Sequence, residues 1–164
     1  MTRKQLTLFL DQGEAQTIEY IRRKYNPAQY HLIKSHITLC REDEIENIEQ
    51  IIYNLEHLNA KAFELSTGPI IRFSKGKGVY LKIKEEKQDF RQLRSLVLNK
   101  VIEAPRLHEA HITLMHPRNS TCTDMTFDQI KKIAIPAKFS ISKISLIEQE
   151  LGKEWKIIRE FSLY

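Results

Sequence analysis

Hydrophobic residues follow two patterns along the chain, which predict short strands and amphipathic helices in turn. Short runs rich in β-branched residues at 5–10, 35–40 and 110–115 are typical of strands. Longer stretches carry apolar residues at helical spacing: Ile18, Ile21 and Tyr25; Ile45, Ile48, Ile52 and Leu55; Phe90, Leu93, Val97 and Val101. The chain is therefore predicted to fold as an α+β protein.

Turn-forming residues set the boundaries of the predicted elements. Asn26-Pro27 ends a helix over about 14–25, and Asp43 is the expected N-cap of the next helix. A further helix is expected over about 86–100. The other expected elements are strands at 62–73, 79–84, 138–148 and 154–163, and a short helix around 127–133.

The order of elements repeats, because the string His-Ile-Thr-Leu occurs at 36–39 and again at 111–114. The offset of 75 residues also pairs Leu6 with Leu81 and Leu8 with Ile83. We therefore predict one bilobal domain over 1–164, with halves of about 1–75 and 76–164. Its two pseudo-symmetric lobes carry antiparallel sheets that face a central cleft, with helices outside. Exchange of strands between the lobes is left open.

Strand geometry turns the repeated string into a predicted site. Side chains alternate faces along a strand, so His36 and Thr38 share one face while Ile37 and Leu39 anchor the other. His111 and Thr113 are related in the same way. If the lobes face each other, two imidazoles and two hydroxyls line one cleft.

Such a cleft suits the cleavage of a phosphodiester. In-line displacement at phosphorus needs one group to take a proton from the nucleophile and another to protonate the leaving oxygen. Histidine titrates near neutral pH, so one copy can be neutral while its partner is protonated. The threonine hydroxyls can stabilise charge on the non-bridging oxygens.

Charge and cysteine content narrow the setting of this chemistry. The net charge of +5 suits an anionic ligand, although an ordinary solvated surface explains it equally well. Cys40 and Cys122 form no C-x-x-C pair and no disulfide framework. The N-terminus lacks a signal-peptide pattern, and no stretch approaches about 20 apolar residues. We expect a cytoplasmic protein with no membrane contact and no obligate protein partner.

The paired strings SHITLC and AHITLM, in two similar α+β halves, resemble the signature of the 2H phosphoesterase superfamily. That group includes 2′-5′ RNA ligase-like proteins and cyclic nucleotide phosphodiesterases. The resemblance implies a bilobal fold, no metal or other cofactor, and a nucleotide or RNA terminus with a 2′,3′-cyclic phosphate or 2′-5′ linkage as substrate. It carries over onto His36, Thr38, His111 and Thr113, with His111 as the base and His36 as the acid.

Three further residues are candidates for substrate binding. Tyr80 can stack on a base, Lys82 belongs to the basic cluster near the turn at 76–78, and Arg118 follows the second motif. A solvated hairpin is the competing interpretation for Lys82.

The sequence also contains residues that could serve two other chemistries, a metal site and a thiol nucleophile. His108 and His111 form H-x-x-H, but on a strand their side chains would point to opposite faces, so no shared metal is expected. Cys40 follows the first motif and shares the strand face of His36, which makes a thiol nucleophile conceivable, but nothing in the sequence indicates thiolate activation.

The sequence thus predicts a metal-independent phosphoesterase with His36 and His111 as its acid/base pair. Ligation of RNA ends is an alternative, because a catalyst accelerates a reaction in both directions. A non-catalytic module that binds RNA ends or nucleotides is the other, although binding alone does not require two titratable groups at matched positions.

Overall fold

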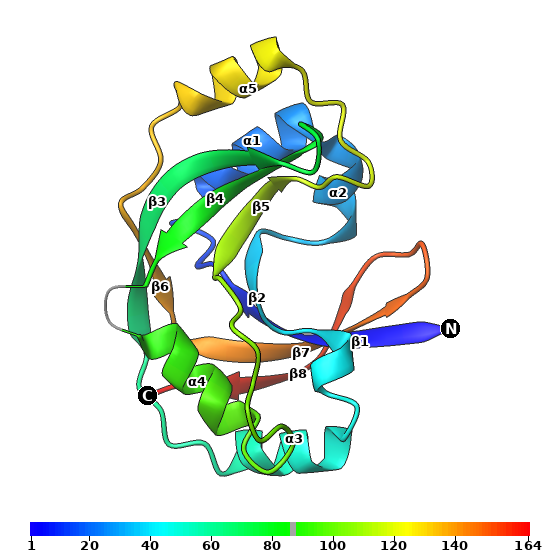
Figure 1. Cartoon of the computed structure of the whole chain (residues 1–164), viewed down its shortest axis with the longest axis vertical. Helices are drawn as coiled ribbons and strands as arrows, with labels where there is room; N and C mark the ends of the chain where they lie inside the picture. Colours follow the sequence, from blue (N-terminus) through cyan, green and yellow to red (C-terminus); the bar gives the residue numbers. More distant parts are fainter. Residues whose placement is uncertain (86–87) are drawn as a thin grey trace.

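A computed structural model describes residues 1–85 and 88–164 of the chain, and these residues form one antiparallel sheet of eight strands (Figure 1). The strand order is β6-β3-β4-β5-β2-β1-β7-β8. The strands are β1 (Thr2–Phe9), β2 (His36–Cys40), β3 (Phe63–Phe73), β4 (Gly78–Lys84), β5 (His111–Met115), β6 (Lys138–Ile141), β7 (Lys143–Glu150) and β8 (Lys156–Ser162). The α+β class is confirmed, but one continuous sheet replaces the two that were expected.

The helices cover the sheet where the sequence places their apolar stripes. They are α1 (Gln16–Tyr25), α2 (Pro27–Leu32), α3 (Ile48–Glu56), α4 (Asp89–Val97) and α5 (Asp124–Lys131), with a 3-10 turn η1 (Glu42–Glu44). Ile18 and Ile21 of α1 are buried, as are Phe90 and Leu93 of α4. Helix α1 packs against β5 and α4 against β2, so each motif strand is backed by a helix from the other half of the sequence.

The sheet is strongly curled, as its connections require. Only Ser142 separates β6 from β7, although β6 is the edge strand at one end of the strand order and β7 lies next to the edge strand at the other end, β8. The Leu163 N–H donates to the Ser142 carbonyl at 2.8 Å, and the Ala62 N–H donates to the Tyr164 carbonyl at 2.8 Å. The C-terminal residues thus tie the end of β8 to the chain around β6 and the start of β3. Figure 1 shows this curl of the strands.

The two motif strands meet in the middle of the sheet. β2 and β5 are antiparallel neighbours, and their register pairs Ile37 with Ile112. The strand order divides there into β6-β3-β4-β5 and β2-β1-β7-β8. Each half therefore contains strands from both halves of the sequence, because β3 lies with β5 whereas β7 and β8 lie with β2.

A β-bulge occurs at the same place in both motif strands. The register shifts between Leu6 and Thr7 where β1 pairs with β2, and between Val79 and Tyr80 where β4 pairs with β5. Such an extra residue re-aims the next side chain. Cys40 is consequently buried in the core. The sequence-based prediction that it shares a strand face with His36 was therefore wrong.

The bulges also show which residues of β1 and β4 correspond. Leu8 lies opposite Ile37, and Leu81 lies opposite Ile112. Leu81 therefore corresponds to Leu8, not to Leu6, so the 75-residue offset holds for the motif strands but not for these neighbours. A register shift of two residues leaves each side chain on the same face of the strand. The alternating sequence pattern therefore could not reveal this shift.

Several predicted boundaries were wrong for local reasons. Asp43 lies in η1, and Asn47 caps α3 by accepting a hydrogen bond from the Gln50 N–H at 3.3 Å. Pro27, expected only to end a helix, also begins α2, where its missing N–H costs nothing. The strand expected at 138–148 is divided at Ser142. Residues 86–87 of the predicted helix lie outside the described residues. Within the described residues, no helix is long and apolar enough to cross a membrane.

Candidate active site

A cleft of about 740 Å³ contains all four residues of the predicted site. Its wall includes His36 and Thr38 from β2, and His111 and Thr113 from β5. All four side chains are half-buried, whereas Ile37, Leu39, Ile112 and Leu114 are buried in the core. The predicted division of each motif into an anchoring face and a chemical face is what the structure has.

The antiparallel register interleaves the two motifs. Since Ile37 lies opposite Ile112, extending this register by one residue sets His36 toward Thr113 and Thr38 toward His111. Each imidazole thus has the hydroxyl of the other motif as its cross-strand neighbour. The two motifs thus contribute to the same face of the sheet on either side of the isoleucine pair.

Both motif histidines have the same tautomer-defining contact. His36 Nδ1 donates to the carbonyl of Lys34 at 2.7 Å, and His111 Nδ1 donates to the carbonyl of Glu109 at 3.0 Å. A hydrogen bond at one ring nitrogen fixes the state of the other. In both residues Nε2 is therefore left for a ligand, as an acceptor when the ring is neutral and as a donor when it is protonated.

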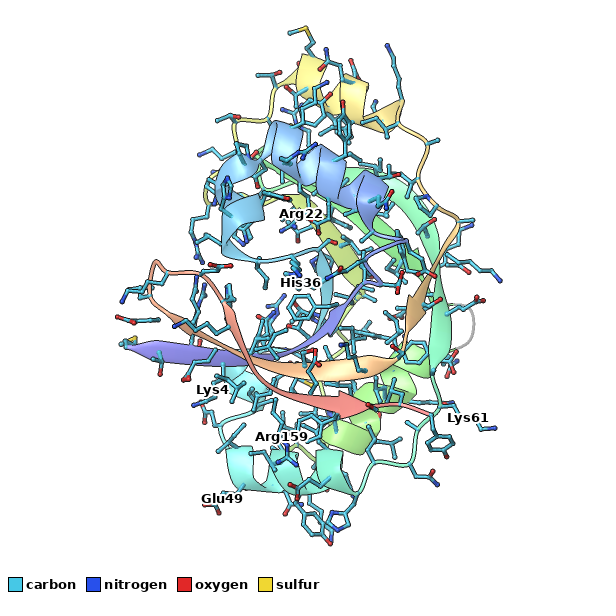
Figure 2. All side chains as sticks on the ribbon, turned by 180° about the vertical axis from the view of Figure 1, so that it is seen from behind. Lys4, Arg22, His36, Glu49, Lys61 and Arg159 are labelled. Atoms are coloured by element: carbon cyan, nitrogen blue, oxygen red, sulfur yellow. The ribbon has the colours of Figure 1, made fainter. Side chains whose placement is uncertain are left out.

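Helix α1 holds the backbone on both sides of Lys34, whose carbonyl accepts from His36. Arg22 Nη2 donates to the Ile33 carbonyl at 2.8 Å, and Glu19 Oε1 accepts from the Ser35 N–H at 2.5 Å. Arg22 and Glu19 also form an ion pair at 3.1 Å. These contacts hold the backbone on both sides of Lys34. Figure 2 shows Arg22 and His36 in the same part of the molecule.

Arg22 was missed in the sequence, although a signal was present. It follows Ile18 and Ile21 on the apolar face of its helix, where a charged residue needs a specific reason. Arg22 is only 1% exposed and lines the cleft. Within the described residues, its Nε has no hydrogen-bond acceptor.

Burial affects the protonation of the site. Burial is the largest of the effects that together lower the pKa of His36 to about 4; the hydrogen bond to the Lys34 carbonyl opposes it, and the charges of Arg22, His111 and His116 add to it. The free protein therefore holds His36 as a neutral imidazole at pH 7. Arg22 thus affects His36 in two ways: it holds the backbone near His36, and its charge lowers the pKa of the imidazole.

His108 is a further residue of the site that sequence reasoning did not select. It precedes β5, donates from Nε2 to the Thr38 carbonyl at 3.0 Å and stacks on Phe90. It lines the same cleft as His111, with 6.2 Å between the ring centroids. The predicted opposite orientation was wrong because residues 103–110 are not a strand. Burial lowers the pKa of His108 to about 4, so it is a neutral link between β2 and the segment before β5.

Gln5 supports the hydroxyl of the first motif. Its Nε2 donates to Thr38 Oγ1 at 3.2 Å and to Thr7 Oγ1 at 2.8 Å. Because the Thr38 oxygen accepts from Gln5, its own O–H is available to donate to a ligand. Gln5 is thus a positioning residue on β1.

The three further candidates for substrate binding lie in different places relative to the cleft. Arg118 lines the cleft, whereas Tyr80 and Lys82 are not among its lining residues. The register places Tyr80 opposite Thr113 and Lys82 opposite His111, and the Tyr80 ring centroid lies 5.1 Å from that of His111. They therefore flank the site on β4.

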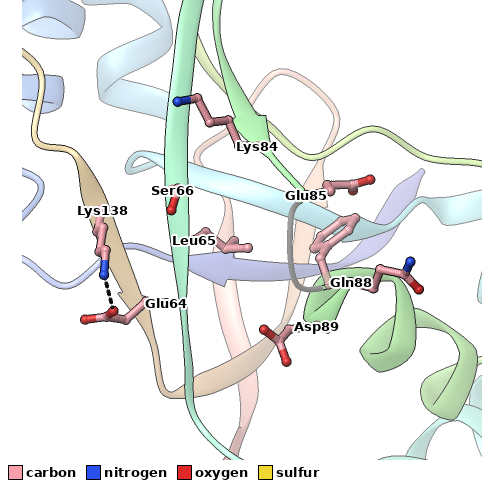
Figure 3. Close-up of a pocket in the computed structure, with 9 residues that line it drawn as sticks. Glu64, Leu65, Ser66, Lys84, Glu85, Gln88, Asp89 and Lys138 are labelled. Atoms are coloured by element: carbon pink, nitrogen blue, oxygen red, sulfur yellow. Dashed lines mark hydrogen bonds and ion pairs between the residues drawn. The ribbon is translucent and has the colours of Figure 1, made fainter.

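Other chemistries find less support in the described residues. These contain no group of three or more His, Cys, Asp or Glu that is arranged to hold a metal ion. Burial raises the pKa of the Cys40 thiol to about 12, which keeps it protonated. A smaller pocket of about 140 Å³ lies between β3, β4 and α4 (Figure 3). Its lining includes an ion pair between Lys138 and Glu64 at 3.2 Å, but neither motif histidine.

Comparison with solved structures shows a shared fold. E. coli LigT complexed with 3'-AMP has a TM-score of 0.68 at 15% identity, covering 99% of this chain and 98% of that chain. E. coli LigT complexed with ATP has a TM-score of 0.69 at 15% identity, covering 99% and 97%. A structure described as a phosphoesterase has a TM-score of 0.67 at 15% identity, covering 99% of both chains.

No curated protein matches the chain by sequence. The family model of the 2'-5' RNA ligase superfamily matches residues 9–153, a range that contains both motif strands, α1 and β4. That range is most of the chain. The protein therefore belongs to the 2'-5' RNA ligase superfamily of 2H phosphoesterases.

Proposed function

We propose that the protein hydrolyses a 2′,3′-cyclic phosphate or a 2′-5′ linkage at a nucleotide or RNA end without a metal ion. The observation that carries this proposal is the matched pair of imidazoles in one cleft, each with Nδ1 bonded to a backbone carbonyl and Nε2 left for the substrate. The E. coli LigT structures with 3'-AMP and ATP support a ligand of nucleotide size.

The proposed reaction is an in-line displacement at phosphorus. One imidazole takes a proton from water as the water oxygen bonds to phosphorus. The other imidazole donates a proton to the ribose oxygen as its bond to phosphorus breaks. Thr38 and Thr113 donate hydrogen bonds to the non-bridging oxygens, where negative charge builds up. The two-fold arrangement of the motifs supports this division, because it offers one imidazole on each side.

The family resemblance assigns His111 as the base and His36 as the acid. The lowered pKa of His36 supports the reverse assignment in the free protein, since only a neutral imidazole can accept the proton of water. We propose His36 as the base and His111 as the acid for hydrolysis.

We also infer that residues 1–164 form one domain, made of two pseudo-symmetric halves that exchange strands. The support is the symmetric strand order about β5 and β2, together with the paired bulges. One chain then supplies both motifs of the site.

The test is hydrolysis of nucleoside 2′,3′-cyclic phosphates and 2′-5′ linked dinucleotides in the presence of EDTA. Wild type should turn over at least one of them, and His36→Ala and His111→Ala should each lower kcat by about 10²–10⁴-fold. His57→Ala is the matched control, because His57 is an exposed histidine at the end of α3. Full activity in both motif variants, or loss of wild-type activity in EDTA, would refute the mechanism. Tight binding of the substrates without turnover would instead indicate a protein that recognises RNA or nucleotide ends without cleaving them.

A further inference from the structure

Three side chains from distant parts of the sequence come together in the cleft. They are Arg3 of β1, Arg118 after β5 and Trp155 between β7 and β8, and all three line the cleft. None of them belongs to the motifs. The same region includes His116, whose pKa is lowered by burial and then by the charges of Arg118 and Arg3.

The guanidinium of Arg3 is held in place by buried groups. Its Nε donates to Gln149 Oε1 at 2.8 Å, and Gln149 is only 2% exposed. Gln149 in turn donates to the Lys153 carbonyl at 2.6 Å. The Trp155 ring centroid lies 4.9 Å from Arg3 Cζ. These contacts use one edge and one face of the guanidinium and fix its orientation.

The other edge of this guanidinium lacks a partner within the described residues. Within the described residues, neither Nη atom of Arg3 has a hydrogen-bond acceptor. In the same part of the chain, no carboxylate lies within ion-pair distance of Arg3 or of Arg118. Two terminal N–H groups in a fixed plane match two oxygens of a phosphate.

The electrostatics of this region are unfavourable without an anion. Burial lowers the pKa of Arg3, the nearby charge of Arg118 lowers it further, and the carboxylate of Glu42 has a smaller opposing effect. Two arginines close enough to affect each other repel. An anion between them would relieve both the repulsion and the missing hydrogen bonds.

Arg3 lies close enough to the motif threonines for both to contact neighbouring groups of one ligand. Arg3 and Gln5 are two residues apart on β1, so they share a face and lie about 7 Å apart along the strand. Gln5 contacts the Thr38 hydroxyl at 3.2 Å. Arg3 therefore lies one short step beyond the place proposed for the reacting phosphate.

We propose that Arg3 and Arg118 form a second phosphate subsite, which selects nucleic acid ends that carry a phosphate on the 5′ side of the terminal nucleotide. The Trp155 ring lies against the Arg3 guanidinium in this subsite, and its backbone N–H donates to the Leu32 carbonyl at the end of α2 at 2.9 Å. The inference rests on the proposed function and adds the substrate class: an RNA end of two or more nucleotides, or a nucleotide with a 5′-phosphate.

The experiment compares adenosine 2′,3′-cyclic phosphate with and without a 5′-phosphate. Wild type should show at least a tenfold higher kcat/KM for the phosphorylated form, as expected for charge-assisted hydrogen bonds to phosphate. Arg3→Met and Arg118→Met should each reduce that preference to about twofold or less. Arg23→Met removes the same charge from an exposed site on α1 and should leave the preference intact.

Binding separates this inference from the proposed function. Calorimetry with adenosine 3′-monophosphate and adenosine 3′,5′-bisphosphate needs no turnover. A wild-type preference of at least tenfold for the bisphosphate, lost in Arg3→Met but kept in Arg23→Met, would support the subsite even if no substrate is hydrolysed. Equal affinities for the two nucleotides in wild type, or a preference that survives in both Arg3→Met and Arg118→Met, would overturn it.

Discussion

Ile37 and Ile112 lie directly opposite each other at the junction of β2 and β5. Because these strands are antiparallel, this single pair sets the register of both motifs. It brings the two imidazoles and the two hydroxyls to one face, where each histidine neighbours the threonine of the other strand. The site is therefore shared between the two copies of the motif, and neither copy is complete alone.

The roles of the two histidines can be separated with a changed leaving group. A substrate with sulfur at the leaving position needs little protonation, so it should restore the activity lost when the acid is removed. With His36 as the base, this substrate should rescue His111→Ala by about tenfold or more and leave His36→Ala inactive. The opposite pattern would establish His36 as the acid, as the family resemblance implies. Rates for the oxygen and sulfur substrates in both variants decide the question.

The motif hydroxyls should matter as hydrogen-bond donors. Thr38→Val and Thr113→Val keep the shape of the side chain and remove the hydroxyl, so each should lower kcat by about 10²-fold. Thr38→Ser and Thr113→Ser are the matched controls and should retain most of the activity. Gln5→Met removes the group that donates to Thr38 and should cost about tenfold in kcat. Unchanged kcat in both valine variants would rule out this role.

The contacts of Arg22 and Glu19 should control the orientation of His36. Arg22→Met removes the hydrogen bond to the Ile33 carbonyl, so we expect kcat to fall by about tenfold with KM within about twofold. Nitrogen-15 NMR of His36 should then show a mixture of ring tautomers in place of the Nδ1–H form. Glu19→Gln should give a smaller effect of the same kind.

Arg23→Met is the control for this prediction, because Arg23 is the exposed neighbour of Arg22. Circular dichroism and thermal unfolding should show that both variants are folded. A variant Arg22→Met with wild-type kcat and an unchanged His36 tautomer would contradict the positioning role. A loss of activity that only parallels the loss of folded protein would contradict it as well.

Two ion pairs near η1 should differ in their contribution to stability. Arg94 pairs with Glu44 at 2.6 Å with both side chains buried, and Arg94 also donates to the Leu39 carbonyl of the first motif. Glu44→Ala would leave the charge of Arg94 buried, at a cost of about 3–5 kcal/mol in the free energy of unfolding. Asp43→Ala breaks the exposed pair with Arg106 and should cost less than about 1 kcal/mol. Equal costs in urea denaturation would show that burial does not decide this difference.

Acid should destabilise the fold through its neutral histidines. The pKa of His36 and that of His108 are lowered to about 4 in the folded protein, against an ordinary value near 6.5. Between these values the unfolded chain binds more protons, so the free energy of unfolding is highest above pH 6.5 and falls as the pH drops toward 4. We expect His108 to account for on the order of 1–2 kcal/mol of this loss, after allowance for solvent screening.

Urea denaturation at pH 7 and pH 4.5 checks this prediction. His108→Gln keeps a donor for the Thr38 carbonyl but cannot titrate, so it should reduce the loss of stability at pH 4.5. The exposed control His57→Gln should follow wild type. A variant His108→Gln with the wild-type pH dependence would contradict the role of His108.

The sequence alone determined the chemical content of the site. Two copies of His-Ile-Thr-Leu, each with the period of a strand, were enough to predict which side chains anchor and which face a ligand. The reason is that alternation of faces is a local property of the backbone. The apolar stripes of α1 and α4 were predictable for the same reason.

The tertiary structure decided what depends on contacts between distant segments. The strand order, the two bulges and the continuous curled sheet follow from pairing partners, which no local pattern specifies. Arg22, His108 and Gln5 act on the motifs through backbone carbonyls or a hydroxyl more than ten residues away in sequence. Likewise, Arg3, Arg118 and Trp155 meet only because the fold brings their segments to one cleft. Local sequence sets the chemistry that each strand carries, whereas the global packing of the chain sets which groups surround it.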